Sequence, residues 1–126
     1  MNKVNIFAIV HASFIVKNTK ISLEFYRDIL RLSIDMTRPD LGYPGAWLNV
    51  GGQQLHLLEL PNPNPITNRP PHGGRDRHVA FSVNQLESLQ NALDQYQIVY
   101  TLSKSSRKAL FVRDPDGNAL EFIQQT

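Results

Sequence analysis

The feature that most constrains this 126-residue chain is a repeat whose two copies each begin with a histidine and end with a residue able to bind a metal. The first copy starts at His11, in the segment HASFIV, and closes at His56, in the segment LHLL. The second starts at His78, in HVAFSV, and closes at Glu121, in LEFI. The two pairs are separated by nearly the same number of residues. We therefore expect two similar units that fold together and bring four side chains to one shared metal site.

The first half of the chain predicts the order β-α-β-β-β. Stretches rich in β-branched and aromatic residues indicate strands, and Asn18 provides a capping side chain just before a segment with helical spacing of apolar residues. Gly51 and Gly52 predict a tight hairpin because glycine tolerates positive φ. The expected strands cover residues 4–16, 32–37, 46–50 and 54–60, and the expected helix covers residues 21–32.

The second half repeats this order. The segment from Asp114 to Gly117, with the sequence DPDG, is a strong turn signal between the last two strands. The expected strands cover residues 78–83, 98–101, 109–112 and 118–124, and the expected helix covers residues 86–96. Pro, Asn and Gly dominate the connection, which also contains His72, and predict irregular structure there. We divide a single domain into a first module (1–60), a linker (61–76) and a second module (77–126).

Composition favours an ordinary globular domain, with 41% hydrophobic and 19% charged residues. The chain has no cysteine, which excludes a thiolate metal site and a cysteine nucleophile. Its net charge is only +2 and its basic residues are scattered, so we expect no nucleic-acid partner. No apolar run approaches the length of about 18 residues that a membrane span requires. We expect a cytoplasmic protein that does not interact with membranes.

The four candidate ligands occupy positions suited to a metal site. Side chains alternate across a strand, so His11 and His78 each share a face with small or polar residues, as the wall of a cavity would. Glu121 lies between Leu120 and Phe122 in an otherwise apolar segment. A carboxylate buried there must be paired or bound to a metal, because an unpaired buried charge is very costly. Glu59 has the opposite parity to His56, and we favour His56 as the ligand.

Three imidazoles and one carboxylate suit one divalent ion such as Zn, Ni, Co, Fe or Mn. Four protein ligands around an octahedral ion would leave two adjacent positions for a substrate with two neighbouring oxygens. Bound there, the ion would act as a Lewis acid that stabilises developing oxyanion charge.

The chain resembles the vicinal oxygen chelate superfamily, which includes glyoxalase I, fosfomycin-resistance proteins, bleomycin-resistance proteins and extradiol dioxygenases. The resemblance covers nearly the whole chain. Its most specific parts are His11 with LEFYRDIL (23–30), RHVAFSV (77–83) and FVRDPDGNALEF (111–122). It implies an α+β fold in which two βαβββ modules form a curved eight-stranded mixed sheet around a metal-site cleft, with the helices outside. In members of the superfamily the site is often completed across a homodimer, and the resemblance implies a homodimer here, with the ligands meeting either within one chain or across two.

The resemblance implies particular roles for individual residues. The metal ligands would be His11, His56, His78 and Glu121, and Glu121 would also be the catalytic group that moves a proton. Glutathione-using glyoxalase I usually has an arginine and an asparagine four residues after its first two ligands, where this chain has Ile15 and Leu60.

Several reactions fit this resemblance. A metal-dependent lyase, isomerase or transferase acting on a small-molecule substrate is our first hypothesis. Arg107 and Lys108 lie in a loop where fosfomycin-resistance enzymes are basic and rich in hydroxyl groups, and they are candidates for holding a substrate anion. The alternatives are a metal-free protein that sequesters a small molecule, as bleomycin-resistance proteins do, and an iron-dependent extradiol dioxygenase.

Overall fold

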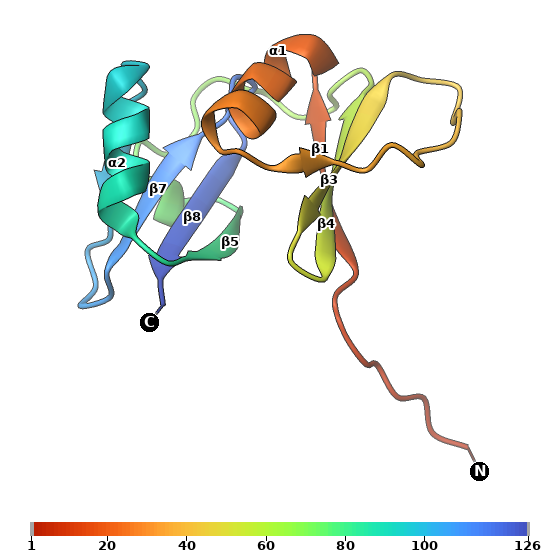
Figure 1. Cartoon of the computed structure of the whole chain (residues 1–126), viewed down its shortest axis with the longest axis horizontal. Helices are drawn as coiled ribbons and strands as arrows, with labels where there is room; N and C mark the ends of the chain where they lie inside the picture. The colour runs from red at the N-terminus through yellow and green to blue at the C-terminus, as the bar shows by residue number, and fades with distance from the viewer. Residues whose placement is uncertain (1, 126) are drawn as a thin grey trace.

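The computed structural model describes residues 2–125 and confirms two successive βαβββ modules (Figure 1). The second module has one regular helix, whereas the helical segment of the first ends in a π-helical turn. The elements of the first module are β1 (His11–Val16), α1 (Thr19–Leu23), η1 (Glu24–Ile29), β2 (Ser33–Ile34), β3 (Gly45–Val50) and β4 (Gln53–Glu59). After η2 (Gly73–Arg75), those of the second are β5 (His78–Val83), α2 (Leu86–Gln95), β6 (Tyr100–Leu102), β7 (Ala109–Arg113) and β8 (Ala119–Gln124).

The eight strands form two sheets of four with the same topology. Their orders are β1-β4-β3-β2 and β5-β8-β7-β6. In each sheet the first strand pairs in parallel with the fourth, and the remaining pairs are antiparallel. Strands β1 and β5 therefore occupy equivalent edges, and the histidines at their first residues occupy equivalent positions.

The helix cap and the two glycine turns form where the sequence predicts them. The Asn18 side chain accepts a hydrogen bond from the Ile21 backbone N–H and caps α1. Gly51 has a φ of 58° in the hairpin between β3 and β4, and Gly117 has a φ of 83° in the turn before β8. Both values lie in the left-handed region that glycine adopts without a steric penalty.

The first helical segment differs from its predicted bounds. It begins at Thr19 and ends at Ile29, and its last six residues are π-helical. The Leu30 N–H binds the Phe25 carbonyl, five residues earlier, and Arg31 then has a φ of 64°. Because a non-glycine residue in the left-handed region ends helical geometry, the helix stops before Leu32.

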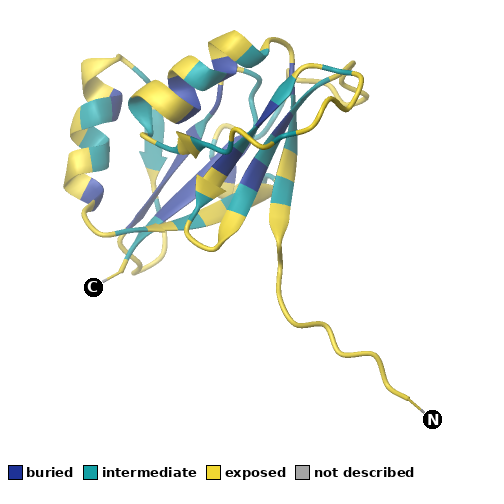
Figure 2. Ribbon diagram, turned by 45° about the vertical axis from the view of Figure 1, so that its right-hand side comes forward, coloured by how far each residue is buried: buried dark blue, intermediate teal, exposed yellow. Residues whose placement is uncertain are grey.

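One hydrophobic core extends through both modules. Buried residues, dark blue in Figure 2, alternate with less buried ones along β3 and β4, whereas β7 and β8 each bury four consecutive residues. Each fully buried leucine contributes roughly 1.5–3 kcal/mol to folding. The largest fully buried side chains are those of Tyr26, Leu48, Leu55, Leu57, Leu93, Leu110 and Leu120.

The two modules are joined by the turn between β7 and β8. The buried Tyr26 hydroxyl, from the first module, donates to Asp114 Oδ2 at 2.7 Å. The Asp116 carboxylate accepts from the Lys17 backbone N–H at 2.9 Å, and the Asn118 amide donates to the Ile15 carbonyl at 3.2 Å. Burial raises the pKa of both Tyr26 and Asp114, while hydrogen bonds from Asn118 and Tyr26 to the Asp114 carboxylate oppose part of its rise.

The predicted first strand is too long at its N-terminal end. Strand β1 begins at His11, and residues 2–10 run away from the folded body as an extended, exposed segment (Figures 1 and 2). The Val10 carbonyl accepts one hydrogen bond from the Gln54 N–H, at 3.1 Å. Since β4 begins at Gln53, it extends no further alongside the segment. Residues 4–10 have a high strand propensity, but within residues 2–125 no strand of the same copy lies beside residues 4–9 to pair with them.

The linker is irregular, as predicted, apart from the short 3-10 turn η2. No helix within residues 2–125 has the length and apolar character needed to cross a bilayer.

Replacing Tyr26 with phenylalanine tests the connection between the modules. We expect Tyr26→Phe to lower the free energy of unfolding by about 1–3 kcal/mol, because it removes a hydrogen bond to a buried carboxylate. The measurement is urea denaturation followed by circular dichroism. Tyr96→Phe is the matched control, since the Tyr96 side chain is exposed. Equal stability of the two variants would show that the hydroxyl of Tyr26 contributes nothing to the junction.

Candidate metal centre

Three rings stack in a column on one face of the first sheet. The ring centroids of His11 and His56 are 4.0 Å apart with planes 16° apart, and those of Trp47 and His56 are 4.5 Å apart with planes 9° apart. The strand register explains the column, because β4 lies between β1 and β3 and pairs His56 with Ser13 on one side and Trp47 on the other. Two predicted ligands, His11 and His56, are thus in contact.

The surroundings of His56 favour its neutral form. Its Nε2 atom lies 2.9 Å from Gln54 Oε1. Burial, followed by the nearby charges of His11 and Arg38, lowers the pKa of His56, and Asp35 opposes this only in part. The neutral imidazole is therefore favoured, and because Gln54 Oε1 accepts the Nε2 proton, the lone pair lies on Nδ1.

The neighbouring carboxylate of Glu59 lies on the other side of the sheet, as its parity predicts. It accepts a hydrogen bond from the Thr19 backbone N–H at 2.7 Å. Glu59 therefore anchors the start of α1 and does not face the ring column.

The other two predicted ligands form a pair on the second sheet. Glu121, in β8, is only 3% exposed, and its Oε1 atom lies 3.2 Å from His78 Nε2. The neighbouring strand places them together, because β5 and β8 are parallel and pair Ala80 with Glu121. The carboxylate is buried, and it is paired, as the sequence requires of a buried carboxylate at this position.

The hydrogen bonds of His78 fix its tautomer. Its Nδ1 atom lies 2.8 Å from the Asp76 carbonyl oxygen, which can only accept, so Nδ1 carries a proton. In a neutral ring Nε2 then presents a lone pair toward Glu121 Oε1, and two acceptors at this distance repel each other. A cation between them, either a proton on Nε2 or a metal ion, removes the repulsion. Metal-binding histidines commonly donate their second N–H to a carbonyl in this way, so the pair fits a metal.

The second carboxylate oxygen of Glu121 contacts the loop before β7. Arg107 Nη2 lies 3.1 Å from Glu121 Oε2, and the Arg107 side chain is 59% exposed. Hydroxyl groups shape the loop, since Ser105 Oγ accepts from the Arg107 backbone N–H and contacts Ser103 Oγ. Lys108 is exposed beside it. The structure thus brings Arg107 to the predicted site.

His72 contributes to the same face, although its place in the linker predicts a surface residue. It is partly buried, and its Nδ1 atom lies 2.7 Å from Thr101 Oγ1. Phe111 is buried between two imidazoles, with ring centroids 4.7 Å from His72 and 5.3 Å from His78. The linker folds back over the sheet, and nothing local to His72 indicates that contact.

The four predicted ligands therefore form two pairs on two different sheets. His11 and His56 lie on the first sheet, and His78 and Glu121 on the second. Across residues 2–125 of a single copy, no group of three or more His, Cys, Asp or Glu side chains comes close enough to hold one ion.

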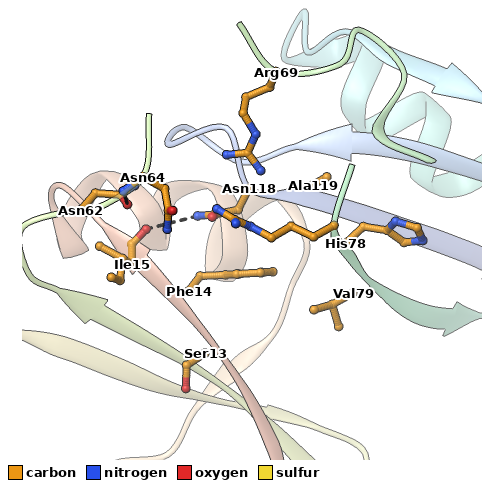
Figure 3. Close-up of a pocket in the computed structure, with 11 residues that line it drawn as sticks. Ser13, Phe14, Ile15, Asn62, Asn64, Arg69, His78, Val79, Asn118 and Ala119 are labelled. Carbon is orange, nitrogen blue, oxygen red and sulfur yellow. Dashed lines mark hydrogen bonds between the residues drawn. The ribbon is translucent and has the colours of Figure 1, made fainter. Parts of the chain in front are cut away.

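A polar cleft of about 340 Å³ lies between β1 and β5, next to His78 (Figure 3). Linker amides and guanidinium groups provide its polar lining, and Phe14 provides apolar surface. The sequence predicts an irregular linker but gives no signal that its amides line a cavity. The lining residues are Ser13, Phe14, Ile15, Asn62, Asn64, Arg69, Arg77, His78, Val79, Asn118 and Ala119.

An ionic network fixes the wall of this cleft. Asp76 lies 2.8 Å from both Arg69 and Arg113, and Arg113 also donates to the carbonyls of Pro70 and Gly117. Burial would raise the pKa of Asp76, but hydrogen bonds from Arg69, Arg113 and the Arg77 backbone N–H together lower it to about 2. The network holds the linker against β7 just before His78.

Comparison with known proteins shows one consistent family. The sequence model described as the Glyoxalase/Bleomycin resistance protein/Dioxygenase superfamily matches residues 8–122. A protein of Arabidopsis thaliana named Glyoxylase I 4 is 27% identical, over 95% of this chain and 72% of its own length.

Solved structures show the same fold. A putative glyoxalase family protein from Bacillus anthracis has a TM-score of 0.81 and 22% identity, covering 99% of this chain and all of its own. The fosfomycin resistance protein FosX from Listeria monocytogenes has a TM-score of 0.76 and 13% identity, over 97% and 94% of the two chains. The lactoylglutathione lyase of Agrobacterium tumefaciens has a TM-score of 0.65 and 20% identity, over 93% and 92%. At these identities the structural matches establish the fold alone.

Replacing Asp76 with asparagine tests the ionic network. A carboxylate with a lowered pKa stabilises the fold fully above its unfolded pKa of about 3.9. That contribution is lost as the pH falls toward its folded pKa of about 2. We therefore expect Asp76→Asn to lower the free energy of unfolding by about 1–3 kcal/mol at pH 7. The difference from the wild type should shrink between pH 4 and pH 3, as measured by urea denaturation. A pH-independent difference would contradict the assignment.

Proposed function

Because the chain belongs to the Glyoxalase/Bleomycin resistance protein/Dioxygenase superfamily, we propose that it is a divalent-metal-dependent enzyme acting on a small oxygenated substrate. The reaction would be that of a lyase, an isomerase or a transferase. One observation supports this most strongly: the proton on His78 Nδ1 points to the Asp76 carbonyl, leaving Nε2 to face a buried carboxylate across 3.2 Å. A divalent ion shared by these two groups suits both of them.

The remaining ligands would be His11 and His56. Their rings lie nearly parallel at 4.0 Å, and an imidazole binds a metal within its own ring plane, so one ring must turn for both to share an ion. His11 is exposed at the start of an edge strand and can turn, whereas His56 is stacked on Trp47. Three nitrogen donors and one oxygen donor suit Zn, Ni, Co, Fe or Mn.

A homodimer would complete the site. Each copy carries one pair of ligands on each sheet, and no three approach one another within residues 2–125 of one copy. In a two-fold dimer, the pair of His11 and His56 from one copy would meet His78 and Glu121 of the partner subunit. Symmetry then creates two equivalent sites, since an isologous contact is made twice.

The chemistry would follow from the residues at the second pair. When bound, the ion would act as a Lewis acid on neighbouring substrate oxygens. The Glu121 carboxylate would take a proton from a substrate carbon and return it. Arg107, which contacts Glu121 Oε2 at 3.1 Å and is largely exposed, would bind an anionic group of the substrate, with Lys108 beside it. Phe111 is buried against His78 and would close the floor of the site to water.

The named relatives suggest two forms of this reaction. One is similar to a lactoylglutathione lyase and the other to a fosfomycin-resistance protein. The basic, serine-rich loop from Ser103 to Lys108 favours an anionic substrate. Ile15 and Leu60 stand where glutathione-using relatives carry an arginine and an asparagine, so we propose a substrate other than a glutathione adduct.

A metal-free binding protein is the second candidate. Arg107 and a protonated His78 would together satisfy the Glu121 carboxylate without an ion. The polar cleft of about 340 Å³ between β1 and β5 could then hold a small molecule by its amide and guanidinium groups alone.

Subunit complementation tests the proposed metal site. One variant carries His11→Ala and His56→Ala, and the other carries His78→Ala and Glu121→Gln. We expect each alone to lose metal, because even the loss of a residue that supports a ligand commonly costs 10–100-fold in affinity, and each variant loses two ligands. A heterodimer of the two should regain one ion per dimer, because one of its two sites keeps all four ligands. Elemental analysis of protein purified without a nickel column and loaded with Zn or Co gives the stoichiometry.

His72→Ala is the control for this experiment, since it removes the fourth histidine of the chain without touching the proposed ligand set. It should bind one ion per copy, like the wild type. Heterodimers that gain no metal would contradict a shared site. Wild-type protein that binds no stoichiometric metal would favour the metal-free candidate.

Neutralising the loop tests its role in anion binding. We expect Arg107→Gln combined with Lys108→Gln to weaken binding of inorganic phosphate to the metal-loaded protein by roughly 10–100-fold at low salt, because a hydrogen bond to a charged group contributes about 1.5–3 kcal/mol. Titration calorimetry measures the affinity. The control is Lys17→Gln with Lys20→Gln, which removes the same charge near α1. Equal affinities of the two double variants would show that the loop does not bind the anion.

A further inference from the structure

Residues 2–10, which we call the arm, are the most unusual surface of this protein. The arm projects from β1 away from both sheets and is exposed along its whole length (Figures 1 and 2). Its large apolar side chains are Val4, Ile6, Phe7, Ile9 and Val10, which are between 71% and 93% exposed. On soluble proteins, a large contiguous apolar surface that is exposed commonly marks an interaction site.

The composition of the arm is that of a strand buried on both faces. From Ile6 to Val10 every residue is apolar, and three of the five are β-branched. Within residues 2–10 the only backbone pairing to a strand is the bond from the Gln54 N–H to the Val10 carbonyl. The arm therefore has both apolar side chains and free backbone groups to offer to the edge of a sheet.

The two sheets leave four edge strands, of which one suits the arm best. Strands β2 and β6 have only two and three residues, too few to pair with the arm. Strand β1 continues directly into the arm, and Asn118 already occupies its Ile15 carbonyl. Strand β5 has six residues and pairs only with β8. It contains no lysine or proline, the residues that commonly protect an exposed edge from pairing.

The surface beside β5 offers both apolar and polar contacts. A cavity of about 530 Å³ lies there, and its apolar lining includes Ile9 at the root of the arm together with Val79 and Phe81 of β5. Its polar lining comes from the side chains of Gln53, Gln54, His78 and Ser82, which can bind the backbone of an added segment. The arm leads away from its own β5, so the arm of another copy is the segment free to reach this edge.

We propose that the arm docks on a second copy of this chain, where it adds a strand along the open edge of β5, and that the two copies exchange arms reciprocally. The choice of a second copy rests in part on the proposed function, since the ligand pairs also require two copies. Each apolar side chain of the arm would bury roughly 60–120 Å² of surface. Two arms and the surfaces that they cover then exceed the ~1,000 Å² that a specific interface needs.

Charge substitution in the arm tests the exchange. Ile6→Asp combined with Phe7→Asp places two carboxylates in the proposed interface, and we expect the dimer dissociation constant to rise at least 100-fold in analytical ultracentrifugation. Both residues are exposed in one copy, so folding of the monomer should be unchanged by circular dichroism. The matched control is Met36→Asp combined with Val99→Asp, at side chains exposed to a similar degree outside the arm. The control should dimerise like the wild type.

Hydrogen exchange locates the docking edge. In the wild-type protein we expect slow amide exchange both in residues 4–10 and along β5, and faster exchange of both in the arm variant. A wild-type monomer, or a dimer whose affinity the arm variant leaves unchanged, would overturn the exchange of arms. Protection of the arm without protection of β5 would overturn the docking edge.

Metal stoichiometry separates this inference from the proposed function. A dimer that binds metal but does not depend on the arm would contradict arm exchange alone. A dimer that depends on the arm but never binds metal would contradict the metal-dependent function alone.

Discussion

The hydrogen bond between Tyr26 and Asp114 is the interaction on which the rest of the architecture depends. The carboxylate of Asp114 also accepts from the backbone N–H groups of Asp116 and Asn118 and from the Asn118 side chain. One buried group thus closes the turn before β8 and holds the helix of the other module against it. Because this contact lies on the core side of the sheets, the faces that carry His11 and Glu121 are left free for chemistry.

The local features of this fold follow from the sequence, while its long-range contacts do not. The cap at Asn18 and the turns at Gly51 and Gly117 depend on residues a few positions apart, and the sequence predicts all three. The strand predicted from residue 4 begins only at His11, because strand formation requires a partner strand and β4 begins at Gln53. Composition reports the tendency of a segment to pair, not whether a partner lies beside it.

The same distinction applies to the candidate site. Apolar neighbours on both sides of Glu121 predict that its carboxylate, if buried, must be paired or bound to a metal, and the structure shows it buried and paired. Strand parity separates His56 from Glu59 correctly. The contact of Arg107 with Glu121 and the packing of His72 on Phe111 depend on how a loop and a linker fold back over the sheet. The spacing of residues along the chain does not predict such contacts. For the same reason it does not predict that the four ligands are divided into two pairs on two sheets.

The hydrogen bond from His78 Nδ1 to the Asp76 carbonyl has a consequence for how this protein tolerates mutation. The atom that fixes the ring is the main-chain carbonyl of residue 76, whereas the side chain of the same residue binds two arginines. Every amino acid can supply that carbonyl, whereas the contacts with the two arginines require the carboxylate. A substitution at residue 76 therefore removes the arginine contacts directly, but reaches the imidazole only by moving the main chain that carries its acceptor.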